Sequence, residues 1–531
     1  MIKGKWYMTF KNLLLIVILL IGFMAFLPPK EESADTKSPT TQASDDAHES
    51  SVEIKYVLRV YPGNWYLPGM MIYNVGKPVE NLRNVAAKFE ELYPDTKIEF
   101  AGVPVVREWL VTQLSGRLAP DILSINVEDV WQDTHKGWFI SLDDYLNQPN
   151  PFVEKGQPGS EKWWDLFKYQ AITRGKAAPD GKMYCITLDM IETAIFYNKD
   201  IFSKVGIDAP GDWIEFLEIQ NKLREAGYIP FLGVLDWMVD WGVDLVFDQL
   251  YYPVLEGIDI VKEPLREQYL QGYLDWDEIA FLHSKGLFTE NDPRYQSLWR
   301  ILKEWRTYWN KDVVSADVLR LFYTQKGAML WNASMLVDRL VKDPDLAFEW
   351  GVFYPPPIPK EYNQYCDGHM MCVIGGAATQ LTLTNSAIKD TNNPATSERL
   401  KRCIAFLQFL TIPENAELVI NEIAMMLPNI NGVEPHAALM PFHDILQRRY
   451  TTTKWYFTFD LKFNEIMNRM LLLYLNDGIS EDEHMNWTQK NLNAAIDSIM
   501  KRKKIDFEGF EQKWQELKPV RQSMGMVEYE D

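Results

Sequence analysis

An apolar stretch of the sequence contains two carboxylates. Residues 183–202 read MYCITLDMIETAIFYNKDIF, in which Asp189 and Glu192 interrupt what otherwise reads as core. A charged group is costly to bury unless it is paired or faces a wet cavity. A carboxylate in a cavity can accept hydrogen bonds from ligand hydroxyls, each worth roughly 1.5–3 kcal/mol. We interpret this segment as the floor of a cleft between two lobes; a salt bridge or a helix cap is the alternative for each carboxylate.

Tryptophans and acidic residues also follow several predicted strands. In a parallel sheet, ligands bind beyond the carboxyl ends of the strands. Indole rings can stack on a flat ligand face, and carboxylates can bind the polar groups at its edge. The residues at these strand ends are Trp65, Asn126, Glu128, Asp129, Asp236, Trp237 and Trp241. The alternative for each tryptophan is a core position, and for each acidic residue a solvated loop or a cap.

The elements that must position these residues alternate in type. The expected strands are 54–62, 96–103 and 121–125, and the expected helices between them are 79–93 and 106–117. This alternation predicts βαβ units and a parallel sheet. A second series starts after residue 200, where Asp212 and Glu215 form a capping box and Gly227 ends the helix. Helices dominate from residue 395 to the C-terminus.

The composition limits the function classes. The chain has 531 residues, which favours two lobes or more, and a net charge of −20, which argues against nucleic acid or anionic lipid as the main partner. The sequence contains no G-x-S-x-G, H-E-x-x-H or P-loop motif. Four cysteines do not make a disulfide scaffold, and Cys366, His369 and Cys372 fit no standard zinc spacing. We expect no metal and no cofactor.

The N-terminal residues predict a location outside the cytoplasm. Lysines precede an apolar run from Leu13 to Leu27, the pattern of a signal peptide or an N-terminal membrane anchor over residues 1–29. Residues 30–52 are almost free of apolar side chains, which predicts a disordered tether. We expect the protein to be associated with the cell membrane through this anchor, or secreted.

Ten segments, in order, resemble one family. They are AAKFEELYPDTKIEF, LAPDIL, KGWFISLDDYL, DGKMYCITLDMIETAIFYNKDIFSKVGIDAP, DWIEF, LREAGYIPF, FYTQKGAMLWNASML, WGVFYPPP, CIAFLQFLTIPENAELV and AMMLPNINGV. Over residues 53–435 the chain thus resembles the extracellular solute-binding proteins that deliver sugars to ABC importers. It departs from them in lacking a lipobox cysteine, in its long region after residue 440, and in having Cys185-Ile186-Thr187 where many relatives carry Gly-x-Pro.

The resemblance implies an α/β, two-lobe periplasmic-binding-protein-like fold of type II. Each lobe would be a mainly parallel sheet flanked by helices. Three hinge crossings are expected near 184–192, 327–334 and 368–376. The implied lobes are residues 53–188 with 331–370, and residues 189–330 with 371–531.

The resemblance also implies a function without covalent chemistry. A monomer would capture a sugar or oligosaccharide between the lobes, close about its hinge, and deliver the ligand to the transmembrane subunits of an ABC permease. The expected stacking residues are Trp65, Trp237 and Trp331, with Trp241 behind them, and the expected polar ligand contacts are Glu128, Asp129, Asp189, Asp236 and Asp367.

Two other functions remain open on the sequence. An exported glycoside hydrolase would use two carboxylates about 5–9 Å apart, but no acidic pair lies in a recognisable catalytic context. A sensor that presents its ligand to a membrane kinase would have the same fold as the importer component.

Overall fold

The structure, a computed structural model, describes part of the chain. The described residues are 53–104, 106–131, 133–168, 178, 180–260, 274, 276–370, 374–443, 461–503 and 507–526. The expected N-terminal anchor and tether lie outside them, as does Cys372.

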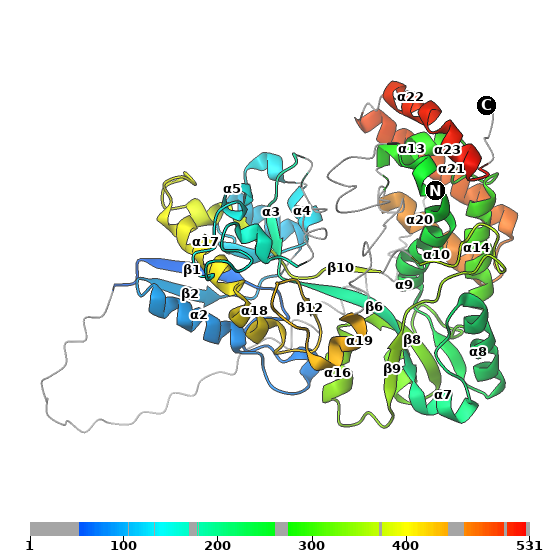
Figure 1. Ribbon diagram of the computed structural model, residues 1–531, viewed down its shortest axis with the longest axis horizontal. Coiled ribbons are helices and arrows are strands. Elements are labelled where there is room, and N and C mark those ends of the chain that lie inside the picture. The colour runs from blue at the N-terminus through cyan, green and yellow to red at the C-terminus, as the bar shows by residue number, and fades with distance from the viewer. Residues whose placement is uncertain are drawn as a thin grey trace, which may run out of the picture. The chain divides into compact units, whose positions relative to one another are not determined.

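The first sheet has six strands and includes the first strand of the described chain (Figure 1). Its strands are β1 (Tyr56–Tyr61), β2 (Thr96–Phe100), β3 (Ile122–Ser124), β4 (Phe139–Ile140), β5 (Cys185–Thr187) and β11 (Gln380–Thr384). Their order is β2-β1-β3-β11-β4, with β5 also on β11. Strand β1 is parallel to β2 and β3, whereas β11 is antiparallel to its three neighbours.

Helices cover this sheet and form the first body with it. They are α2 (Asn81–Leu92), α3 (Arg107–Ser115), α4 (Val127–Trp131), α5 (Asp143–Leu146), α17 (Glu398–Leu410) and α18 (Pro413–Ile420). The predicted apolar stripe of α2 is buried, with Phe89 packed on Phe406, but Leu92 at the helix end is 56% exposed. No single described helix is long and apolar enough to cross a membrane; only the bent pair α17 and α18 meets that criterion, by combined length and composition.

The second sheet also has six strands. They are β6 (Asp189–Asn198), β7 (Ile229–Leu232), β8 (Gly327–Ala333), β9 (Trp350–Phe353), β10 (Gly375–Ala377) and β12 (Leu427–Pro428). The order is β10-β6-β8-β7, and β9 and β12 also pair with β6. Only β7 and β8 are parallel. Both sheets are therefore mixed rather than mainly parallel, because β6 and β11 enter directly from the other sheet without a helical crossover.

The second body consists of this sheet and most of the helices. They are α7 (Lys199–Val205), α8 (Trp213–Glu225), α9 (Leu235–Trp237), α10 (Val243–Tyr251), α11 (Leu255–Ile258), α13 (Trp276–Ser284), α14 (Pro293–Arg306), α15 (Val318–Tyr323), α16 (Leu336–Lys342), α19 (Met440–His443), α20 (Leu461–Leu475), α21 (Glu481–Lys503), α22 (Glu508–Glu516) and α23 (Lys518–Ser523). The predicted cap of α8 is confirmed, since Asp212 accepts a 2.9 Å hydrogen bond from the Glu215 amide. The long C-terminal region packs here through Leu471, Leu492 and Trp514.

Three segments connect the two bodies. The first runs from β5 into β6, as predicted at 184–192, and the second from β10 into β11, next to the predicted 368–376. The third was predicted at 327–334, but that segment is β8, which lies inside the second sheet between β6 and β7. The third connection instead includes β12 and ends where Leu439 enters a core of the second body.

Two segments join a different body from the one we expected. Residues 331–370 were placed with residues 53–188, but β9 pairs with β6, and Ile358 packs in the core of the second body. Conversely, β11, α17 and α18 belong to the first body. Strand partners distant in sequence are chosen by tertiary packing, which the local pattern does not encode.

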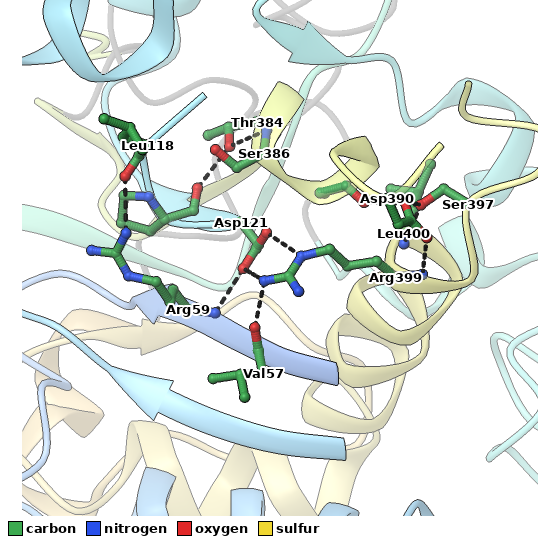
Figure 2. Close-up of polar contacts among 12 residues, drawn as sticks. Val57, Arg59, Leu118, Asp121, Thr384, Ser386, Asp390, Ser397, Arg399 and Leu400 are labelled. Atoms are coloured by element: carbon green, nitrogen blue, oxygen red, sulfur yellow. Dashed lines mark hydrogen bonds and ion pairs between the residues drawn. The ribbon is translucent and has the colours of Figure 1, made fainter. Parts of the chain in front are cut away.

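A buried ion pair fixes α17 to the first sheet (Figure 2). Arg399 donates to both carboxylate oxygens of Asp121, at 2.8 and 2.7 Å, and also to the Val57 carbonyl. The Arg59 backbone amide donates to the same carboxylate at 2.7 Å. Asp121 is 1% exposed and Arg399 7%. The aspartate of the LAPDIL segment therefore holds the sheet and helix together.

Candidate ligand-binding site

Trp65 lies just beyond the carboxyl end of β1, as predicted. It belongs to the β1–α2 loop, which we define as residues 62–80, and its ring is half-buried, 6.2 Å from the ring of Tyr73. The loop approaches the end of the neighbouring strand, because a methyl group placed on Gly63 would lie 3.2 Å from Ser124 Oγ. The ends of β1 and β3 thus present side chains at one edge of the first sheet.

The residues after β3 form the short helix α4. Asn126 is exposed and Asp129 half-buried, whereas the Glu128 side chain lies outside the described part. Beside them, Arg107 donates to both oxygens of Asp133, at 2.5 and 2.9 Å. These bonds raise the pKa of Arg107, and the charge of Asp129 adds to the effect. A cation and a half-buried carboxylate therefore lie near the predicted ligand residues of the first body.

Three predicted residues gather at the carboxyl end of β7. Asp236 is exposed on α9, and Trp237 and Trp241 are half-buried. Their two indole rings are stacked, with centroids 5.2 Å apart and planes 15° from parallel. Trp241 lies on a π-helical turn, Met238–Gly242. Such turns occur frequently at functional sites.

Trp331 is buried behind Trp241 instead of facing solvent. It is 1% exposed, its ring centroid is 5.7 Å from that of Trp241, and its Nε1 donates to Thr193 Oγ1 at 3.0 Å. The expected stacking position is corrected by the packing of β8. The Trp331 ring lies in the core of the second body, with its centroid 6.1 Å from that of Trp305 on α14.

Asp189 is held by the protein itself. It is fully buried; Oδ2 accepts the Tyr66 hydroxyl at 2.5 Å and the Thr379 hydroxyl at 3.1 Å, and Oδ1 accepts the Thr379 amide at 2.8 Å. Burial raises the pKa of Asp189 to about 6, although these hydrogen bonds oppose the rise. The expected cleft-floor carboxylate thus lies on the first connection, but its oxygens are directed to Tyr66 and Thr379. Glu192 is also buried, further along β6.

Asp367 lies apart from these groups in sequence and packing. It is exposed, and its carboxylate accepts the His369 amide at 3.0 Å, an ordinary turn contact.

Sequence reasoning did not find three side chains of this region. Tyr66 and Thr379 are the partners of Asp189, and neither is part of a recognisable motif. Tyr73 is 40% exposed and has φ 52°, a left-handed conformation that side chains rarely adopt. Only the aromatic and methionine richness of WYLPGMMIY (65–73) marks this loop in the sequence.

The described residues contain no group of three or more His, Cys, Asp or Glu side chains placed to hold a metal ion. The described cysteines, Cys185, Cys366 and Cys403, are buried. Burial raises the pKa of Cys366 to about 12, which keeps its thiol protonated.

Comparisons with known proteins identify the fold. Apo RafE from Streptococcus pneumoniae superposes with a TM-score of 0.57 at 16% identity, over 84% of this chain and 99% of that chain. An ABC substrate-binding protein of Listeria monocytogenes, in complex with cycloalternan, gives 0.53 at 17% identity, over 85% and 100% of the two chains. These likenesses confirm the predicted two-lobe α/β fold.

Sequence comparisons agree over shorter ranges. The Multiple sugar-binding protein of Streptococcus mutans is 21% identical over 281 residues, 52% of this chain and 59% of that protein. For a binding protein of Brucella abortus, the match is 27% identical over 148 residues and spans only 32% of that protein. The family model for the bacterial extracellular solute-binding protein matches residues 76–417, more than half of the chain. The chain therefore belongs to the family of bacterial extracellular solute-binding proteins, as its sequence motifs predicted.

Proposed function

We propose that this protein binds a sugar or oligosaccharide outside the cytoplasm and delivers it to an ABC permease. The observation that carries the proposal is the stacked, half-buried pair of Trp237 and Trp241 at a strand end. A flat indole surface that remains partly exposed is suited to the C–H face of a sugar ring. Similar proteins named for sugar binding, or solved with raffinose or cycloalternan, support the same ligand class.

The ligand contacts divide between the two bodies. The proposed contacts of the second body are Asp236, Trp237 and Trp241, and those of the first body are Trp65, Glu128 and Asp129. A ligand that touches both bodies favours the closed state by its differential affinity for that state. Closure would turn about the three connections, and the closed monomer is the form that the permease would recognise. Asp367 would contribute only if closure carries its turn to the ligand.

Location and partner follow from the family and from the N-terminal sequence. The family is extracellular, and residues 1–29 would hold the protein at the membrane or direct its secretion. The permease is the proposed receiver of the ligand, and a sensor that presents its ligand to a membrane kinase is the alternative, because the two would share this fold and these motifs. No covalent step is required, so the protein would return its ligand unchanged.

A thermal-shift screen of the full chain tests this proposal. Mono- and oligosaccharides are compared with polyols and polyamines as controls, and the sugar is recovered and analysed after binding. Binding to the native state alone stabilises it by roughly 2.7 kcal/mol at a hundredfold excess over Kd. A saturable shift with unchanged sugar is expected. A shortened sugar would indicate a glycoside hydrolase, and the absence of any sugar-dependent shift would contradict the proposal.

A further inference from the structure

Backbone hydrogen bonds at residues 188–189 join the three connections between the bodies. The Leu188 amide donates to the Thr379 carbonyl at 3.0 Å, and the Ala378 amide donates to the Asp189 carbonyl at 3.1 Å. On the other side, the Asn429 amide donates to the Leu188 carbonyl at 3.1 Å. Residues 188–189 are thus the centre of a junction that includes all three connections.

The Asp189 side chain adds a fourth segment to this junction. Its carboxylate accepts two bonds from Thr379, on the second connection, and one from Tyr66, on the β1–α2 loop. Tyr66 is 2% exposed, so these bonds are made away from water. Burial and the neighbouring Asp189 charge raise the pKa of Tyr66, which keeps the hydroxyl protonated as a donor. Tyr66 is the titratable group that faces the Asp189 carboxylate.

The β1–α2 loop also reaches the second body at its other end. A methyl group placed on Gly76 would lie 3.3 Å from Lys342 Cδ of α16. Tyr73 lies close enough to Asp338 and Arg339 of the same helix for their charges to act on its hydroxyl. The loop that carries Trp65 is therefore covalently continuous with β1 and α2 of the first body. Tyr66 connects it to the junction, and Tyr73 and Gly76 lie against α16.

We propose that Asp189 is a positioning residue for ligand binding, which ties the Trp65 loop to the connections between the bodies without touching the ligand. Movement of the connections then moves Trp65, and a ligand that fixes Trp65 biases the connections. The effect on ligand affinity rests on the proposed function. The mechanical link itself does not, because the link is a set of contacts within the chain.

Substitutions can separate this role from a general contribution to stability. Asp189→Ala removes the acceptor shared by the loop and the second connection. Asp189→Asn keeps the three bonds and reverses two of them, because the amide oxygen can accept the Thr379 amide while the NH₂ group donates to the two hydroxyl oxygens. Tyr66→Phe removes only the bond to the loop. Tyr251→Phe is the matched control, since Tyr251 donates a similar buried hydrogen bond of 2.6 Å to Asp292, outside the junction.

Hydrogen–deuterium exchange of the full chain, without ligand, tests the link. We expect exchange about tenfold faster in residues 62–76 and also in 374–384 for Asp189→Ala, the loss of a bond to a charged group. Tyr66→Phe should affect residues 62–76 by a similar factor, and Asp189→Asn should exchange no faster than the wild type in either segment. The proposal is overturned if only one segment responds to Asp189→Ala, if Asp189→Asn behaves like Asp189→Ala, or if Tyr251→Phe gives the same pattern.

The consequence for affinity is measured separately, on the sugar retained by the thermal screen. Asp189→Ala and Tyr66→Phe should each raise its Kd by about tenfold, with Tyr251→Phe and Asp189→Asn near the wild-type value. If the wild-type chain binds no sugar, the proposed function fails while the exchange experiment still decides the link. If exchange responds as expected but Kd is unchanged in both variants, the positioning role is overturned.

Discussion

Trp237 and Trp241 present stacked indole rings whose centroids are 5.2 Å apart. The ring of buried Trp331 contacts Trp241, and both indoles of the pair remain partly exposed. Trp241→Ala should weaken sugar binding about tenfold, because an aromatic contact contributes roughly 0.5–1.5 kcal/mol beyond the area it buries. Isothermal titration with the sugar found by the thermal screen measures this change.

Trp487→Ala provides the control for this first prediction. Trp487 is 49% exposed on α21, in the C-terminal helices, and we expect its removal to leave Kd unchanged. Equal losses of affinity in the two variants would mean that Trp241 acts through the fold and not through the ligand.

The ion pair of Asp121 and Arg399 should contribute strongly to stability. Arg399→Met leaves the Asp121 carboxylate buried with only the Arg59 amide and should lower the free energy of unfolding by about 3–5 kcal/mol. The double variant Asp121→Leu with Arg399→Met removes both charges and should recover most of that loss. Urea titration measures both variants.

A neighbouring pair on the same helix provides the comparison. Lys401 and Glu398 form an exposed ion pair, so Lys401→Ala should change the free energy of unfolding by less than about 1 kcal/mol. A loss in this variant as large as in Arg399→Met would show that the helix, not the buried pair, determines the effect.

Local sequence pattern predicted the parts of the fold that are local. The alternation over residues 54–125 gave the β1, α2, β2, α3 and β3 order, because apolar spacing directly reflects helix and strand periods. The cap at Asp212 followed from a four-residue motif, the capping box Asp212–Glu215. The assignment of β9 and β11 to the two sheets did not follow, since a strand's own residues do not specify a partner far along the chain.

The same distinction applies to the candidate site. Because a buried charge is costly, the sequence predicted that Asp189 is either paired or faces a solvated cavity. Its partners Tyr66 and Thr379 could not be predicted, since they are 123 and 190 residues away in sequence. Trp331 could not be distinguished from Trp241 by type, because both follow apolar runs. The packing of Trp331 against Trp305 of α14 buries it, whereas Trp241 on its π-helical turn stays half-buried.

Protonation of Asp189 should stabilise the folded protein at low pH. Its pKa in the folded state, about 6, is above its ordinary value of 3.8, so the native state binds the extra proton between these values. This contribution is fully present below pH 3.8 and is lost as pH rises through 6. Above that pH, the buried charge costs about 3 kcal/mol.

Asp189→Asn removes this titration and retains the shape of the side chain. We therefore expect the variant to exceed the wild type in unfolding free energy by up to about 3 kcal/mol at pH 7.5, and the difference to vanish near pH 4. Urea titrations at several pH values measure it. A difference that is the same at every pH would contradict an ionisable Asp189.

His484 should act in the opposite direction. It is fully buried, its ring is stacked on Tyr474 at 4.6 Å and lies against the edge of Trp299, and burial lowers its pKa from 6.5 to about 4. Between pH 6.5 and 4, His484 is therefore protonated in the unfolded chain but neutral in the native state. The resulting loss of stability on acidification starts near pH 6.5 and reaches about 2 kcal/mol by pH 5.

His484→Phe keeps a ring of similar size between Tyr474 and Trp299 but cannot titrate. The difference in unfolding free energy between the wild type and this variant should thus change by about 2 kcal/mol between pH 7.5 and pH 5, in favour of the variant. Because Asp189 titrates in the same range with the opposite sign, the comparison must be made within each pH against the wild type. A pH-independent difference would mean that His484 is accessible to protons in the native state, and that the C-terminal helices do not exclude water from it.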